Sequence, residues 1–197
     1  MFSRLVRRTH MYLALFLAPW MLMYAVSTLV MNHRAVFVER YGSGPVPFHK
    51  ERELVYDGSF SPDVDLKMIS RQILTSLDLD GAHGATRRKD GAIVINRNDL
   101  ITPRRITFTP DTRTLLVEHQ ERRPNAFLER FHRRRGYATG YRLDTSWAVT
   151  VDAVIVAMVF WALSGLWMWW EMKVTRALGA LAFLGGIGLF ALYLVLL

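Results

Sequence analysis

Four side chains that could carry out chemistry stand near the ends of long apolar runs. His10 and His33 bracket the first run, His132 precedes the second, and Asp152 lies about five residues inside the second. Imidazole is the commonest metal ligand and a proton carrier near neutral pH. A carboxylate inside an apolar run is costly and usually faces a partner or water. These four residues therefore form the candidate site.

Cysteine is absent from the 197 residues. This excludes disulfides, iron–sulfur clusters, thiolate catalysis, cysteine-ligated zinc and covalently attached c-type haem. Any cofactor must be held by His, Met or carboxylate. The sequence also contains no nucleophile-elbow, protease or dinucleotide-binding motif. No catalytic residue is predicted, and whether the protein is an enzyme stays open.

Asp152 has two interpretations. It lies roughly 7 Å inside the second apolar run at 1.5 Å per residue. It could accept a hydrogen bond from the second ring nitrogen of a ligand histidine and so fix its tautomer. Alternatively, it pairs with Arg34 or Arg142 near the surface.

Three apolar runs must position these residues. They are Met11–Met31, Trp147–Trp170 and Ala177–Leu197. Each is long enough, at about 20 residues, to cross a hydrocarbon core of roughly 30 Å. The sequence therefore predicts three transmembrane helices, with the lipid bilayer as the first partner.

Positive charge on the flanks predicts the orientation. Arg4, Arg7 and Arg8 precede the first run, and Lys173 and Arg176 lie between the second and third runs. Such flanks mark the cytoplasmic side. We expect a bacterial inner membrane protein with a cytoplasmic N-terminus and a periplasmic large loop and C-terminus. The alternative, a signal peptide cleaved near position 25, does not account for the two later runs.

The large loop predicts a small α+β domain. A helix is expected to begin at Ser61 and Pro62, with apolar residues at helical spacing after them. Short strands follow around Ile93–Ile95, Ile106–Thr109 and Leu115–Val117. The predicted fold class is therefore a membrane α-helical protein that carries one helix on antiparallel strands outside the cytoplasm.

The predicted organisation has seven parts. They are the N-terminus with the first transmembrane helix (1–34), a linker (35–60), the α+β domain (61–123), an interfacial helix and connection (124–146), the second transmembrane helix (147–170), a cytoplasmic turn (171–176) and the third transmembrane helix (177–197).

Four short motifs occur in a characteristic order. The first span is preceded by Arg7–His10 and followed by His33-Arg34, His132 comes before the second span, and Ser164–Trp167 lies within it. With the helix-and-strand loop between the spans, this order resembles the PepSY domain and PepSY-associated transmembrane-helix family. The chain departs from the family's usual Thr-Gly late in the first span, where it has Ser27-Thr28.

The resemblance implies haem. Larger members of the family are membrane reductases, some acting on siderophore-bound iron, with b-type haems on histidines between helices. A bis-histidine haem b needs two neutral imidazoles at one depth. His33 and His132 both lie on the outer side and form the predicted iron-ligand pair. His10 is the inner candidate, with Met168 or Met172 as a partner. Alternatively, these histidines are solvated in the headgroup layer.

The charged run 127–136 fits an interfacial helix. Phe127, Leu128 and Phe131 share one face, and its arginines could pair with lipid phosphates or with haem propionates. No nucleic-acid partner is expected for an external, membrane-bound segment.

The function expected is that of a b-haem-binding electron-transfer subunit of a larger redox assembly. A second copy or another membrane redox subunit would complete the site, because such cofactors usually lie between facing helices. The alternative is a non-enzymatic, membrane-anchored PepSY module that binds or scaffolds a partner or inhibits a protease.

Overall fold

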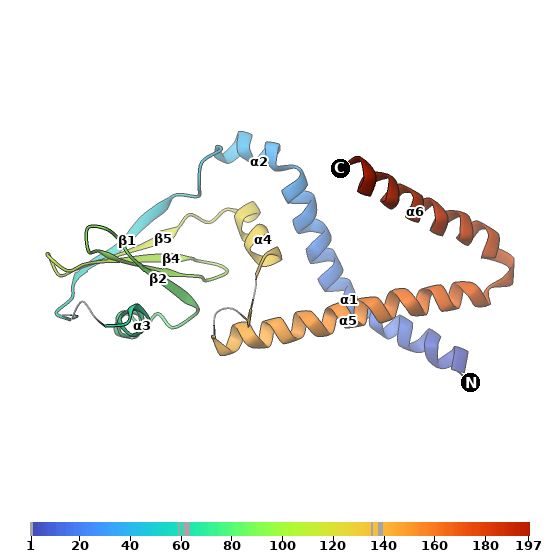
Figure 1. Cartoon of the computed structure of the whole chain (residues 1–197), viewed down its shortest axis with the longest axis horizontal. Coiled ribbons are helices and arrows are strands. Elements are labelled where there is room, and N and C mark those ends of the chain that lie inside the picture. Colours follow the sequence, from blue (N-terminus) through green and yellow to red (C-terminus); the bar gives the residue numbers. More distant parts are fainter. Residues whose placement is uncertain (1, 59, 61–63, 135, 138–139) are drawn as a thin grey trace. The chain divides into compact units, whose positions relative to one another are not determined.

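The computed structural model describes residues 2–58, 60, 64–134, 136–137 and 140–197. The chain divides into two compact units (Figure 1). One unit combines residues 1–22 with 150–197, and the other comprises residues 23–149.

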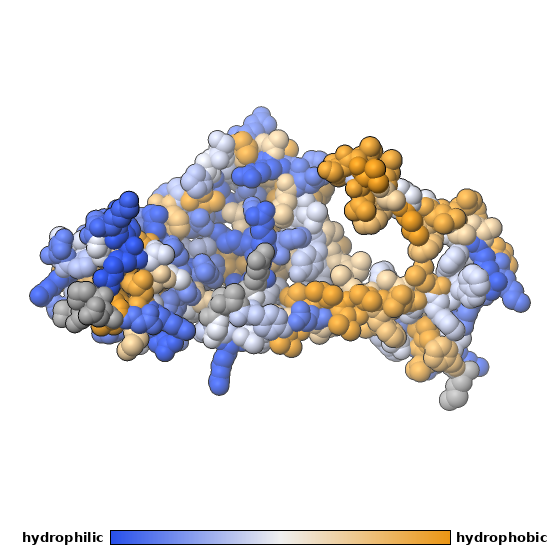
Figure 2. Space-filling view, viewed as in Figure 1, coloured by the Kyte–Doolittle hydropathy of each residue, from blue (hydrophilic) through white to orange (hydrophobic). Residues whose placement is uncertain are grey.

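Within the described residues, three helices are long and apolar enough to cross a membrane. They are α1 (Phe2–Asn32), α5 (Arg142–Glu171) and α6 (Arg176–Leu196), the last preceded by the short 3-10 helix η2 (Lys173–Thr175). Figure 2 shows hydrophobic residues gathered over α6 and much of α5. The three predicted spans are therefore confirmed as apolar helices, and the chain is a membrane protein by these features.

Helix α5 begins before the apolar run that predicts it. Its first residue is Arg142, five residues before Trp147, and Thr145 N–H donates to the Tyr141 carbonyl at 3.0 Å. Polar residues extend a helix as readily as apolar ones, and an acid in the first turn suits the helix dipole. Asp144 occupies that turn. The apolar pattern marks where a helix enters lipid rather than where it starts.

Helices α1 and α5 run antiparallel in the first unit. The Ser3 hydroxyl donates to Glu171 at 2.6 Å, and seven residues further along α1 His10 meets Ser164 at 2.8 Å. Helices α5 and α6 meet at Gly179, where a Cβ would lie 1.9 Å from Trp169 Nε1. Glycine is needed there because the indole edge occupies the space of a side chain.

The second unit contains a five-stranded antiparallel sheet within its described residues, in the order β1-β5-β4-β3-β2. The strands are β1 (Phe48–Val55), β2 (His83–Arg87), β3 (Ile93–Arg97), β4 (Arg104–Thr109) and β5 (Thr114–Gln120). The helices are α2 (Arg34–Tyr41), α3 (Leu66–Ser76) and α4 (Pro124–His132).

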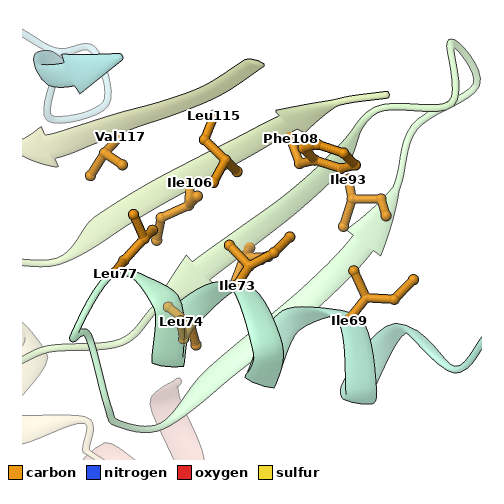
Figure 3. Packing of buried hydrophobic residues seen from close by; sticks show 10 residues of the cluster. Ile69, Ile73, Leu74, Leu77, Ile93, Ile106, Phe108, Leu115 and Val117 are labelled. Carbon is orange, nitrogen blue, oxygen red and sulfur yellow. The ribbon is translucent and has the colours of Figure 1, made fainter. Parts of the chain in front are cut away.

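Helix α3 covers one face of this sheet (Figure 3). Its buried residues Ile69, Ile73 and Leu74 recur at helical spacing. Residues of β3, β4 and β5 alternate between buried and less buried positions, as a half-covered sheet requires. The predicted packing of one helix on antiparallel strands is therefore confirmed.

The start of α3 differs from the expectation. Asp65 caps the helix by accepting a hydrogen bond from Lys67 N–H at 3.1 Å, and the helix begins at Leu66. The predicted start at Ser61 and Pro62 lies outside the described residues. Aspartate is as good an N-cap as serine, so the motif alone did not choose between them.

Two elements occupy the range 35–60, which the sequence predicts as a linker. Helix α2 and strand β1 both lie there. Strand β1 is an edge strand, exposed along nearly all its length, and it pairs with β5. Because neither of its faces is buried, its sequence lacks the alternation that identifies strands.

Candidate functional site

His10 is held by a buried serine of α5. His10 Nδ1 lies 2.8 Å from Ser164 Oγ, and the Ser164 hydroxyl donates to the Trp161 carbonyl at 2.8 Å. A hydroxyl has one proton, so Ser164 must accept from His10. In the neutral imidazole this network places the proton on Nδ1 and leaves the lone pair on Nε2.

The ring of His10 is fixed on two further sides. It stacks on Trp161 with centroids 5.3 Å apart and planes 17° apart. A Cβ on Gly165 would lie 3.3 Å from His10 Cε1. Two residues of the Ser164–Trp167 motif thus have roles here, since Ser164 orients the imidazole and Gly165 makes room for it.

Gly165→Val is expected to lower the free energy of unfolding by about 1–3 kcal/mol, because the added carbons must displace the His10 ring. Gly186→Val is the matched control, since a Cβ there meets nothing within 4 Å. Unfolding of both variants in mixed detergent micelles measures the difference. Equal stability of the two variants would contradict the close approach of His10 and Gly165.

A carboxylate joins the same two helices near their ends. Glu171 accepts hydrogen bonds from Ser3 at 2.6 Å, from Trp167 Nε1 at 3.2 Å and from Arg7 at 3.5 Å. Trp167 also makes an edge contact with Phe2. This cluster fixes the register of α1 against α5 and therefore the level at which His10 meets Ser164.

His132 is held in the same way in the second unit. Its Nδ1 lies 2.7 Å from Ser27 Oγ, and the Ser27 hydroxyl donates to the Tyr24 carbonyl at 2.9 Å. Ser27 is fully buried. The Tyr24 ring meets the imidazole edge-on at 5.0 Å. Because the single hydroxyl proton of Ser27 is used on the Tyr24 carbonyl, Nδ1 of His132 must donate to Ser27. In the neutral imidazole the lone pair is then on Nε2.

His83 provides a contrast in the α+β domain. Its Nδ1 lies 2.9 Å from the Gly81 carbonyl, and its Nε2 lies 3.0 Å from Ser70 Oγ. Both ring nitrogens are therefore used by the protein. Among the described residues, no hydrogen bond reaches Nε2 of His10 or of His132. His10 and His132 thus differ from His83 in that no hydrogen bond of the described residues uses their Nε2.

His33 lies between α1 and α2 and is exposed. Its backbone continues the helix, because its N–H donates to the Leu29 carbonyl at 3.0 Å. It follows Ser27, the partner of His132, by six residues, which is roughly 9 Å along a helix. No hydrogen bond or ring contact joins His33 to His132 among the described residues. Their pairing on one haem stays a prediction.

Asp152 is exposed on α5, and its predicted role beside a ligand histidine stays a prediction. A different acid is buried. Asp144 is 3% exposed and forms an ion pair with Arg134. Gly136 is also buried, and a Cβ on it would lie 2.0 Å from the Asp144 carbonyl oxygen. Sequence reasoning missed Asp144 because it precedes the apolar run.

The three arginines of the run 127–136 that the structure describes bond to groups of the protein. Arg133 pairs with Glu129 at 3.0 Å, and Arg134 pairs with Asp144. Arg130 donates to the neutral side-chain oxygen of Gln120 at 2.5 Å. Burial lowers the pKa of Arg130, and nearby Asp99 only partly opposes the effect. Arg130, to which no carboxylate among the described residues bonds, is the feature of this run that the sequence did not predict.

The apolar side of α4 also has partners in the second unit. Phe127 and Phe131 stack with centroids 6.0 Å apart, and Phe131 lies 5.1 Å from the ring of Trp147. The predicted shared face of Phe127 and Phe131 is thus present. Part of it packs on the start of α5.

Among the described residues, no group of three or more His, Cys, Asp or Glu is placed to hold a metal ion. His10 and His132 could each supply one imidazole ligand to a haem iron. His10 and His132 each have Nδ1 hydrogen-bonded to a serine oxygen, as iron-ligating imidazoles usually have Nδ1–H bound to an acceptor.

Comparison with known proteins supplies the family. No curated protein and no solved structure matches the chain. The model of a family described as Putative PepSY_TM-like matches residues 1–197. The match covers the whole chain, the spans and the α+β domain alike, and the chain therefore belongs to the PepSY_TM-like family.

Proposed function

We propose that this membrane protein of the PepSY_TM-like family binds b-type haem through His132 and His10 and serves as an electron-transfer subunit of a larger assembly. The observation that supports the proposal is the repeated serine–histidine pair. In both pairs the serine uses its proton on a helix carbonyl and accepts from Nδ1–H. This leaves Nε2 of each imidazole as a neutral, oriented donor for iron.

The haem would supply one-electron transfer, and the residues of this chain would position it. Ser27 and Ser164 hold the imidazole tautomers, and the Trp161 ring packs against His10. His33 is roughly 9 Å beyond the level of Ser27 along the chain's helix. We therefore assign the second iron ligand to a second copy of the chain or to another membrane redox subunit.

The proposed location is the bacterial inner membrane, with the α+β domain in the periplasm. Basic residues before α1 and between α5 and α6 support a cytoplasmic N-terminus and turn. In this orientation His10 would lie toward the cytoplasmic side and His132 toward the periplasmic side.

The absorption spectrum of the full chain tests the proposal. Protein expressed with added δ-aminolevulinate and purified in detergent is expected to show a reduced b-type α-band. His132→Ala should lower the haem content, and the double variant with His10→Ala should remove the band. His83→Ala is the control, because both of its ring nitrogens already have protein partners. A folded but colourless wild-type preparation would overturn the proposal.

His33→Ala tests the predicted ligand pair separately. Loss of the band in this variant would assign the second ligand to His33. An unchanged band would support a ligand from another chain.

A second candidate function is a membrane-anchored binding module without haem. The observation in its favour is a cavity of about 710 Å³ within the second unit. This volume falls in the range of small-molecule sites, which is about 300–1,000 Å³. A colourless protein that binds a ligand in this cavity would support this function over the first.

A further inference from the structure

The cavity lies entirely within the second unit. Its walls are the start of β1, the end of β3 with the loop after it, the start of β4, the end of β5, one side of α4 and the first turn of α5. Apolar side chains, among them Phe48, Leu100 and Pro103, line part of it. The cavity therefore offers an apolar surface next to charged groups, as small-molecule sites usually do.

Positive charge prevails in this cavity. Its lining contains five arginines and three carboxylates. The arginines are Arg97, Arg104, Arg130, Arg133 and Arg134, and the acids are Asp99, Glu129 and Asp144. The lining by itself thus carries an excess of two positive charges. An anion entering the cavity would meet a favourable field.

Four of these arginines have a carboxylate partner. Arg97 pairs with Asp99 at 2.7 Å, and Arg104 pairs with Glu51 at 2.8 Å. Arg133 and Arg134 pair with Glu129 and Asp144, as described above. Their charges are largely neutralised locally and contribute mainly to the shape of the cavity.

Arg130 is different. Among the described residues, no carboxylate bonds to it, and its Nε is buried without a hydrogen-bond partner. The oxygens of nearby Asp99 are used by Arg97 and by the Ile101 N–H. A guanidinium without a carboxylate partner keeps its attraction for an anion that enters the cavity.

Gln120 holds Arg130 in place without neutralising it. Its side-chain oxygen accepts from Arg130, while its nitrogen donates to the Val46 carbonyl at 3.4 Å. The amide therefore orients the guanidinium and leaves its charge available. The fork of N–H groups on arginine matches phosphate and carboxylate oxygens in two-point contacts.

We propose that this cavity binds the phosphate monoester group of a small organic anion, with Arg130 as the main contact and the apolar wall receiving the organic part. A phosphate monoester carries a charge of about −1.5 to −2 at pH 7, which would be attracted to the charge of Arg130 that no described carboxylate offsets. The ligand is either a soluble phosphate ester or a lipid with the same headgroup. This inference goes beyond the proposed haem function and does not depend on it.

Calorimetric titration of the full chain in detergent with phenyl phosphate tests the soluble source. Arg130→Gln is expected to weaken binding about 10–100-fold, as loss of a charge-assisted hydrogen bond implies. Arg88→Gln is the control, because Arg88 is paired with exposed Asp90 and does not line the cavity. Wild-type affinity in Arg130→Gln would overturn the proposal.

A lipid-binding experiment tests whether the ligand is a lipid with a phosphate monoester headgroup. The chain is reconstituted in phosphatidylcholine nanodiscs with and without phosphatidate, and native mass spectrometry measures the lipid it retains. Retention of phosphatidate that is lost in Arg130→Gln, without phenyl phosphate binding, would assign the site to a lipid. Failure of both probes to bind the folded wild-type chain would overturn the proposal.

Gln120→Glu provides a second variant that preserves shape. The new carboxylate would form an ion pair with Arg130 and neutralise its charge. Phosphate binding should therefore fall as in Arg130→Gln, while the fold is kept. Circular dichroism checks the fold of each variant. Full phosphate binding by folded Gln120→Glu would contradict the role of Arg130, even if Arg130→Gln proved unstable.

Discussion

Arg134→Gln is expected to lower the free energy of unfolding by about 3–5 kcal/mol. The substitution leaves the Asp144 carboxylate, which is 3% exposed, without its cation. An uncompensated buried charge costs far more than the loss of a surface pair, because water does not reach it. Unfolding in mixed micelles of dodecylmaltoside and dodecyl sulfate measures the change.

The neighbouring arginine supplies the matched control for this prediction. Arg133 pairs with Glu129, and the two side chains are 65% and 41% exposed. Arg133→Gln should therefore cost less than about 1 kcal/mol. Asp144→Asn combined with Arg134→Gln should recover part of the loss, since no charge remains buried. Equal effects of the two arginine substitutions would contradict a structural role for the Arg134–Asp144 pair.

Under the proposed function, in which His132 is a haem ligand, Ser27→Ala is expected to weaken haem binding about 10–100-fold, as loss of an outer partner of a ligand imidazole commonly does. Without the hydroxyl, Nδ1–H of His132 has no described acceptor, and the Nε2–H tautomer becomes accessible. In that tautomer the lone pair is on Nδ1, beside Tyr24 and α1. Haem titration of the purified apoprotein, followed by the α-band, measures the affinity.

Two further variants separate the hydrogen bond from packing. Ser27→Thr keeps a hydroxyl and should restore most of the affinity. Ser70→Ala removes the other serine–histidine contact of this unit, to His83, and should leave haem binding unchanged. If Ser27→Ala binds haem as the wild type does, Ser27 does not position the ligand.

The family pattern is informative at Ser27. Members commonly show Thr-Gly late in the first span, where this chain has Ser27-Thr28. The structure gives a hydroxyl at this point a specific task, which is to accept from His132 while it donates to the helix carbonyl. A serine performs this task as a threonine would, so the departure from the pattern retains the chemistry.

The local pattern of apolar residues was sufficient to predict the transmembrane helices and the elements that bury one face in the core. The three apolar runs are helices, and the apolar spacing of Ile69, Ile73 and Leu74 indicates the face of α3 that packs on the sheet. Strand β1 escaped prediction because an edge strand with two exposed faces has no such spacing. Burial of one face produces a periodic spacing of apolar residues in the sequence, whereas backbone pairing of an edge strand does not.

By itself the sequence determined the family motifs, the three spans and the set of histidines beside them, since each depends on residue types within a short window. The tertiary structure decided their partners. Ser27 and His132 are 105 positions apart, and His10 and Ser164 are 154 positions apart. It also showed that Asp144, rather than Asp152, is a buried acid and that no carboxylate in the described part of the chain bonds to Arg130. Such pairings depend on how distant segments pack, and no local periodicity encodes them.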